Sequence, residues 1–376
     1  MKIWHILMHK ALGLGAGLIN VLVAAAVLVP ETSYLYLTSL SASQIFMAFS
    51  GFGLSHRLVG MSQDDARTQK VWPWFALTQI GGLAVFFWLA QQSETRTTYA
   101  VLVFTGALLL LLLLAEWLRT ATARQSGFII YNLMLLATAP VILWQQDITY
   151  VVAILPFLGC LILLWIGRDF YRLSGTPTHP KITDLLRAFR VASVNQYYNF
   201  IILLFPILGM QADVVIIVLV FRFAIFYNWP NFFWLRFGHK QLAQGITPER
   251  VRQNRKFIAV NLVAFTVTLI AVWIAATFDL FVYLPSGLID LDFAYLLLFF
   301  AGLRVVVNLY FPYELFLVYR STLKQDIWLI GVSLGSFVML AICMSVTQNP
   351  YILITTIELV WLSWRRLSQK VLYSEH

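Results

Sequence analysis

The chain has 376 residues, of which 60% are hydrophobic and 11% are charged, and its formal net charge is +9. Soluble domains usually contain about 45–50% apolar residues, so this composition excludes an ordinary soluble enzyme. The positive charge would suit nucleic acid, but the basic residues lie in short segments between apolar blocks, where membrane topology explains them better. We therefore predict an all-α, polytopic membrane protein with no nucleic-acid partner.

The apolar blocks predict about 12 transmembrane helices, since each block approaches the roughly 20 residues that a helix needs to cross a bilayer. The first six lie at about 11–30, 34–56, 72–91, 98–116, 128–144 and 149–166. The other six lie at about 193–210, 213–235, 257–277, 293–319, 326–346 and 349–365. This division predicts an N-terminal six-helix half (1–170), a cytoplasmic linker (171–192) and a C-terminal six-helix half (193–376). Two such halves around a central cavity are typical of transporters built from repeats.

Lysine and arginine set the predicted orientation, because cytoplasmic loops carry an excess of both. With the N-terminus inside, all but three of the 26 Lys and Arg residues fall on the cytoplasmic side. The exceptions are Arg96 in an outer loop and Arg222 and Arg304 within spans. We therefore expect a multi-pass membrane protein with both termini in the cytoplasm.

Four charged residues fall inside predicted spans, namely Arg222, Arg304, Glu314 and Glu358. A charge in hydrocarbon costs about 2.5–3.5 kcal/mol on insertion scales, which makes such residues functional candidates. A structural interpretation stays open, in which Glu358 pairs with one of the arginines and joins two helices. Two arginines and one glutamate near mid-membrane nevertheless favour a hydrated, cationic cavity that binds an anion.

Polar neighbours extend this candidate site. Arg304 and Asn308 have helical spacing and share one face of the tenth span. Asn195, Tyr198 and Asn199 form a polar face on the seventh span. We predict that these residues bind the substrate.

Small and weakly polar residues in other blocks indicate packing instead. Gly13, Gly17 and Asn20 form one stripe on the first span, which favours close contact with a neighbouring helix. Cys160 and Cys343 lie inside apolar blocks and are expected to be small core residues.

The sequence shows no arrangement typical of catalysis. The six histidines lie in cytoplasmic or terminal segments without metal-ligand spacing, and no glycine-rich phosphate loop with a lysine is present. We therefore predict no enzyme activity, no cofactor and no metal. Two alternatives stay open: a membrane-embedded glycan polymerase or glycosyltransferase that uses the acids of loop 278–292, and a small-molecule exporter.

The second span carries a motif. Pro30-Glu31-Thr32-Ser33-Tyr34-Leu35-Tyr36 is followed by Gly53-Leu54-Ser55-His56-Arg57-Leu58-Val59. These two runs resemble the opening of the polysaccharide transporters in the multidrug/oligosaccharidyl-lipid/polysaccharide exporter superfamily, whose pattern is close to P-E-x-Y-G-x-Y and D-x-G-L-S-x-x-L-V-R. The chain departs from that pattern at Ser33, Tyr34, Gly51 and Gly60. Arg57, three residues before Gly60, would supply the displaced positive charge.

The resemblance implies a flippase of a bacterial inner (plasma) membrane for a polyprenyl-diphosphate-linked oligosaccharide, as used for lipopolysaccharide, capsule or exopolysaccharide. Its partners would be this lipid-linked substrate, membrane lipids and other glycan-assembly proteins of the membrane. On this hypothesis Arg222 and Arg304 hold the diphosphate, because arginine binds phosphate bidentately. The polar faces contact the sugars, and Glu314 or Glu358 carries the coupling proton.

Overall fold

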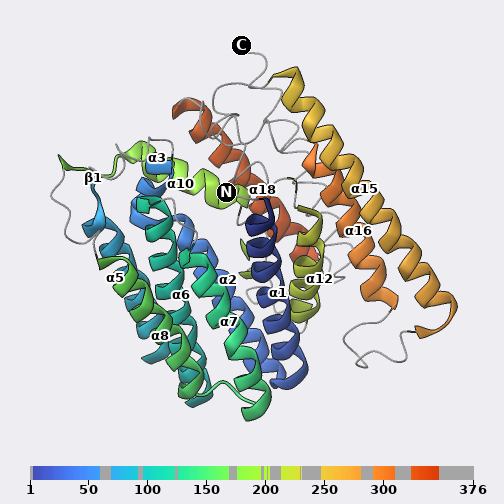
Figure 1. The fold of residues 1–376 in the computed structure, drawn as a ribbon, viewed down its shortest axis with the longest axis horizontal. Helices are drawn as coiled ribbons and strands as arrows, with labels where there is room; N and C mark the ends of the chain where they lie inside the picture. The colour runs from blue at the N-terminus through green and yellow to red at the C-terminus, as the bar shows by residue number, and fades with distance from the viewer. Residues whose placement is uncertain are drawn as a thin grey trace. The chain divides into compact units, whose positions relative to one another are not determined.

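The computed structural model describes residues 3–59, 69–91, 96–122, 126–168, 176–195, 199–200, 202–203, 213–228, 230, 247–280, 291–309 and 323–346. Nearly all of them are helical (Figure 1), which agrees with the all-α prediction. The chain forms two compact units, Met1–Ile207 and Leu208–His376. The arrangement of twelve spans in two six-helix halves stays a prediction.

Among the described residues, the first unit contains the helices α1 (Ile3–Val27), α2 (Pro30–Ala48), α3 (Leu54–Val59), α5 (Trp72–Gln91), α6 (Arg96–Thr122), α7 (Ser126–Gln145), α8 (Tyr150–Ile166) and α10 (Ile182–Asn195). A 3-10 helix, η1 (Ser50–Gly53), separates α2 from α3. The strands β1 (Gln69–Lys70) and β2 (Thr176–Pro177) pair in parallel. The second unit contains α12 (Asp213–Ala224), the 3-10 helix η2 (Ile225–Asn228), α15 (Pro248–Thr277), α16 (Leu291–Asn308) and α18 (Leu323–Val346).

Within the described ranges, three helices are long and apolar enough to cross a membrane. They are Thr97–Leu118, Ser126–Gln145 and Pro248–Thr277. Shorter apolar helices cover Ala11–Val27, Val151–Ile166 and Val215–Asn228. The predicted span 349–365 lies outside the described residues, as do parts of 193–210, 213–235 and 293–319.

Helix α6 is the centre of the first unit. Its sequence runs through seven consecutive leucines at 108–114, and a helix that is apolar all round is expected to be buried. It packs against α2, α5, α7 and α8, while α1 packs mainly on α7 (Figure 1). The apolar stretch of α6 is 78% buried, whereas that of α15 is 11% buried. Helix α15 therefore presents a largely apolar surface outward, as a helix in contact with lipid does.

The predicted span 34–56 is wrong as a single helix, because α2 ends at Ala48 and the chain breaks at η1. Gly51, Phe52 and Gly53 all have positive φ, at 60°, 53° and 84°. Glycine adopts this conformation without steric cost, so the two glycines permit a break that apolarity alone does not reveal. The backbone N–H of Gly51 donates to the hydroxyl of Thr78 at 3.1 Å, which attaches the break to α5.

The predicted linker 171–192 contains the amphipathic helix α10, which continues to Asn195 and packs against η1, α3 and α2. Its first turn is capped by Asp184, whose carboxylate accepts from the backbone N–H of Lys181 at 2.9 Å. The first compact unit thus includes the predicted linker.

In the second unit, α16 packs against both α12 and α15. Phe221 of α12 contacts Phe300 of α16 edge to face, with ring centroids 5.2 Å apart. One apolar cluster of this unit consists of Tyr227 of η2, Ile258 of α15, and Ala301 and Val305 of α16. Burial of these side chains fixes the face that α16 turns toward its neighbours.

Candidate functional site

Helix α16 carries two predicted site residues into the interior of the second unit. Arg304 is 4% exposed and Asn308 is completely buried. They lie four residues apart, so both side chains belong to one face of the helix. Arg222 lies on α12, a helix that packs against α16, and is half-buried.

Asn308 belongs to a hydrogen-bonded group that we call the asparagine cluster, defined as Tyr227, Asn254, Asn261 and Asn308. The backbone carbonyl of Tyr227 accepts from the Nδ2 of Asn261 and from the Nδ2 of Asn308, both at 2.6 Å. The Nδ2 of Asn254 donates to the backbone carbonyl of Asn308 at 3.1 Å. The cluster thus connects η2, α15 and α16 through three amides inside an apolar core.

Two acceptors in this region have no hydrogen-bond partner. The Oδ1 of Asn308 and the Oδ1 of Asn228, the residue next to Tyr227, are both buried and unpaired. A buried, unsatisfied polar atom costs about 1–3 kcal/mol. Each oxygen can accept a hydrogen bond from a hydroxyl or amine, so this part of the cluster can bind a donor.

Arg304 is a buried basic residue of α16. Acidic residues in the described part of the second unit stand at helix ends, namely Asp213, Glu249, Asp279, Asp292 and Asp326. Arg304 lies thirteen residues from the start of α16 and four from its last residue, Asn308, and its side chain is 4% exposed. A cation at this depth attracts an anionic group more strongly than it would in water.

The other predicted site residues lie in the first unit or outside the described residues. Asn199 lies in the first unit, where its Nδ2 donates to the Oε1 of Gln44 at 3.1 Å. Asn195 is the last residue of α10. Tyr198, Glu314 and Glu358 lie outside the described residues, so their roles stay predictions.

Sequence reasoning missed three members of the asparagine cluster. Asn254 and Asn261 are seven residues apart on α15, and Thr268 follows after seven more. The hydroxyl of Tyr227 lies 2.5 Å from the Oγ1 of Thr268, so all three α15 residues face the same group. A seven-residue polar repeat in an apolar helix was the signal that could have identified them.

A second polar group, in the first unit, is fully hydrogen-bonded. The Nδ2 of Asn20 donates to the backbone carbonyl of Leu135 at 2.6 Å and to the hydroxyl of Thr138 at 2.7 Å. Its Oδ1 accepts from the hydroxyl of Tyr36. A Cβ on Gly13 would lie 3.1 Å from the amide of Asn132. The packing interpretation of this stripe is therefore confirmed for Gly13 and Asn20.

The family-like motif forms a contact between η1, α3 and α10. Arg57 makes an ion pair with Asp184, at 3.0 Å between Nη1 and Oδ2, and its Nη2 donates to the carbonyl of His179 at 3.0 Å. Asp184 is 4% exposed and Arg57 is 19% exposed. The ion pair with Asp184 therefore fixes the Arg57 side chain against α10.

Metal binding has no support from the described residues, where no three His, Cys, Asp or Glu side chains come together. No family model, no curated protein and no solved structure matches the chain.

Proposed function

We propose that the chain is a flippase of a bacterial inner membrane, which moves a polyprenyl-diphosphate-linked oligosaccharide across the bilayer by alternating access. The observation that carries the proposal is the burial of Arg304 and Asn308 on one face of α16. A guanidinium binds a diphosphate through paired N–H groups and keeps its charge in an apolar environment. The unpaired Oδ1 of Asn308 can accept a sugar hydroxyl beside that phosphate.

Arg222 supplies the second positive charge of the proposed site, since α12 packs directly on α16. A diphosphate carries negative charge on both phosphates, so two arginines match it better than one. We further propose that Asn195, Tyr198 and Asn199 contact sugars and that Glu314 or Glu358 carries the coupling proton. These roles follow from the predicted topology and from the resemblance of the motif.

The test is complementation of a bacterial strain that lacks its flippase for a surface glycan but makes the matching lipid-linked precursor. Wild type is compared with Arg304→Ala, Arg222→Ala and Arg304→Lys at equal expression. Arg255→Ala is the matched control, because Arg255 is exposed on α15. Surface glycan and the leaflet of the precursor are both measured.

We expect wild type and Arg255→Ala to restore surface glycan, and both arginine-to-alanine variants to leave the precursor on the inner leaflet. Arg304→Lys should restore part of the activity, because lysine keeps the charge but not the bidentate geometry. Full activity of both alanine variants would refute the site. If cells that lack the chain still deliver the precursor to the outer leaflet but make no polymer, the chain would instead act at the polymerase step. The acids of loop 278–292 would then be the candidate catalytic residues.

A further inference from the structure

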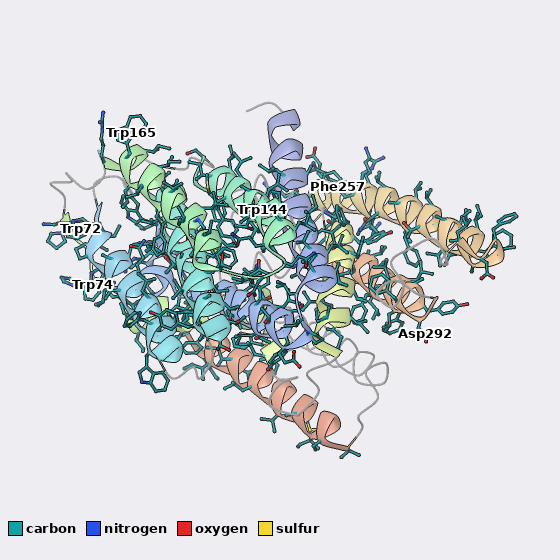
Figure 2. The ribbon with its side chains drawn as sticks, turned by 90° about the horizontal axis from the view of Figure 1, so that it is seen from below. Trp72, Trp74, Trp144, Trp165, Phe257 and Asp292 are labelled. Carbon is teal, nitrogen blue, oxygen red and sulfur yellow. The ribbon has the colours of Figure 1, made fainter. Side chains whose placement is uncertain are left out.

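Helix α15 begins with basic turns and continues as an apolar helix. Its first nine residues, 248–256, contain four basic residues and one acid, Glu249. The basic residues are Arg250, Arg252, Arg255 and Lys256. Phe257 follows them (Figure 2), and from there to the end of the helix no residue is charged. The positive charge is thus confined to one end of the helix.

Two of these cations, Arg252 and Lys256, lie on the outward face of α15. They are four residues apart, and Val263 and Ile270 follow Lys256 after seven and fourteen residues, so all four share one stripe. Arg252 and Lys256 are exposed, and Val263 is 65% exposed. Asn261 of the asparagine cluster, on the opposite face, is 1% exposed. The two cations are therefore in line with apolar side chains that point away from the core.

The described part of the chain gives these two cations no partner. Neither Arg252 nor Lys256 makes an ion pair or a hydrogen bond there. The N-terminus of α15 adds the positive end of the helix dipole beside them. An anionic group that approaches this turn therefore meets positive charge that the protein itself does not neutralise.

The length of the uncharged stretch matches a bilayer. Lys256 and Trp273 are 17 residues apart, which is about 26 Å along a helix, and the hydrocarbon core of a bilayer is about 30 Å thick. Trp273 is 67% exposed, and exposed tryptophans are typical of a membrane interface. With Trp273 at one interface, Arg252 and Lys256 reach the headgroups of the other leaflet, which is the predicted cytoplasmic one.

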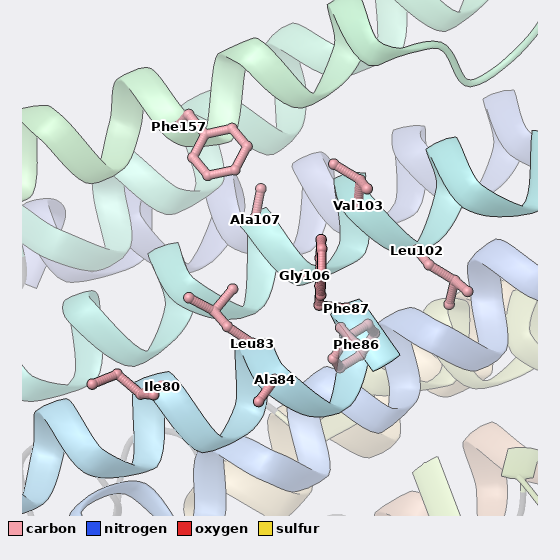
Figure 3. Close-up of a pocket in the computed structure, with 10 residues that line it drawn as sticks. All are labelled: Ile80, Leu83, Ala84, Phe86, Phe87, Leu102, Val103, Gly106, Ala107 and Phe157. Atoms are coloured by element: carbon pink, nitrogen blue, oxygen red, sulfur yellow. The ribbon is translucent and has the colours of Figure 1, made fainter. Parts of the chain in front are cut away.

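The combination of charge and apolar surface selects the ligand. The groove between α5, α6 and α8 of the first unit is lined by apolar side chains such as Leu83 and Phe157 (Figure 3), and such walls do not distinguish one apolar ligand from another. On α15, a soluble anion would contact only the two cations, and an uncharged lipid would contact only the apolar stripe. A lipid with an anionic headgroup contacts both.

We propose that Arg252 and Lys256 bind the headgroup phosphate of an anionic phospholipid, whose acyl chains lie along Val263 and Ile270. Basic residues at the cytoplasmic end of a transmembrane helix attract anionic headgroups. A zwitterionic lipid binds less well, because its own cation competes with the protein for the phosphate. The inference rests on α15 crossing the membrane, and it would stand even if the chain transports no glycan.

The test measures which lipid lies beside this turn of α15. Full-length protein in a Cys343→Ser background, where the remaining Cys160 is 3% exposed, carries an uncharged fluorophore on Ala259→Cys. Ala259 is exposed, one turn after Lys256. The protein is placed in phosphatidylcholine vesicles with an equal small fraction of either phosphatidylglycerol or phosphatidylcholine that carries a nitroxide near the top of one acyl chain. Quenching of the fluorophore gives the relative association constant of the two lipids.

We expect phosphatidylglycerol to quench the fluorophore at position 259 more strongly than phosphatidylcholine. Arg252→Gln/Lys256→Gln should lower the relative association constant by about five-fold or more, the effect of one basic residue near an anionic surface. Lys70→Gln/Lys181→Gln is the matched control, because it removes the same charge from exposed positions of the first unit, and it should change nothing. A fluorophore on Ile274→Cys, at the other end of α15, should be quenched equally by both lipids.

A measurement on the unsubstituted turn tests the same contact without a change of sequence. Added salt should lower the preference for phosphatidylglycerol when Arg252 and Lys256 are present, because salt screens charges at a surface. Equal quenching by both lipids at position 259, or an equal loss in the two double variants, would overturn the proposal. A preference abolished by inorganic phosphate at constant ionic strength would also overturn it, and would assign the two cations to a soluble anion.

Discussion

Gly53 is the position where a single methyl group is expected to disturb the first unit most. Its φ of 84° is strained for any residue with a Cβ, and a Cβ built there would lie 2.2 Å from the backbone oxygen of Asp184. That oxygen belongs to α10, so the clash cannot be relieved by rotating a side chain. Gly53→Ala therefore has to separate η1 from α10 and weaken the Arg57–Asp184 ion pair beside it.

The expected loss in the free energy of unfolding of Gly53→Ala is the sum of two contributions. A left-handed conformation costs a residue other than glycine about 1–2 kcal/mol, and an overpacked contact costs about 1–3 kcal/mol. Together they predict a loss of about 2–5 kcal/mol in the free energy of unfolding, by the same principles. One kcal/mol shifts the Tm of a domain of this size by about 2–4 °C, so the Tm should fall by roughly 4–20 °C.

The assay is thermal unfolding in detergent, followed with a dye that becomes fluorescent when it reacts with a thiol. In a Cys343→Ser background the chain keeps one cysteine, Cys160, which is 3% exposed on α8 in the same unit as Gly53. Dye reaction therefore reports unfolding of the first unit. The control is Gly81→Ala on α5, where a Cβ would meet nothing within 4 Å. It should be neutral or stabilise the protein by about 0.5–1 kcal/mol.

A Tm of Gly53→Ala equal to that of Gly81→Ala would refute the reasoning, because both variants add the same methyl group to a glycine of the same unit. A third variant, Gly51→Ala, gives a further check, because its Tm should be intermediate. Gly51 also has positive φ, but a Cβ added there would meet the ring of Phe75, at 2.7 Å from Cε2. A side chain can move more easily than a backbone, so its loss of Tm should lie between those of the other two variants.

Three further perturbations test the polar contacts. Arg57→Ala and Asp184→Ala should each destabilise the protein by about 1–3 kcal/mol, and the double variant by less than their sum, since the partners interact directly; a double-mutant cycle of unfolding free energies measures the coupling, and additive effects would contradict the pair. Asn20→Ala should lower the free energy of unfolding by about 1–3 kcal/mol, because it leaves buried partners on α2 and α7 unpaired. An unchanged Tm would contradict a stabilising role for Asn20. Tyr227→Phe removes only the hydroxyl contact to Thr268 and should lower the unfolding free energy by about 0.6 kcal/mol, as expected for such bonds between membrane helices. Asn308→Ala should cost more, because it breaks the bond to the Tyr227 carbonyl, and equal losses for the two variants would contradict this ranking.

The sequence predicted the positions of helices better than their breaks. The predicted span 72–91 coincides with α5, and 149–166 begins one residue before α8. Apolarity and length are local properties, so a window over the chain detects them. The break at Gly51–Gly53 depends on backbone φ, and a hydropathy window does not contain that information. The Gly-Phe-Gly sequence was its visible signal.

The candidate site was predictable only in part. Burial of Arg304 and Asn308 on one face of α16 followed from their spacing. Their surroundings did not, because the partners of Asn308 come from η2 and α15, and the Arg57–Asp184 pair joins residues far apart in the chain. Contacts between distant segments depend on how helices pack, which one sequence does not specify.

The two polar groups inside apolar helices show how a structural brace differs from a candidate binding site. Asn20 uses both its amide hydrogens and its carbonyl oxygen within the protein, so adding a ligand would break bonds already made. Asn308 uses its amide but leaves its oxygen unpaired, and the Oδ1 of Asn228, the residue after Tyr227, is unpaired as well. An unsatisfied acceptor in an apolar core lowers stability, and a ligand that donates a hydrogen bond would recover that free energy on binding. We therefore expect the asparagine cluster to take part in substrate binding. We expect the Asn20 group to stabilise the packing of α1, α2 and α7.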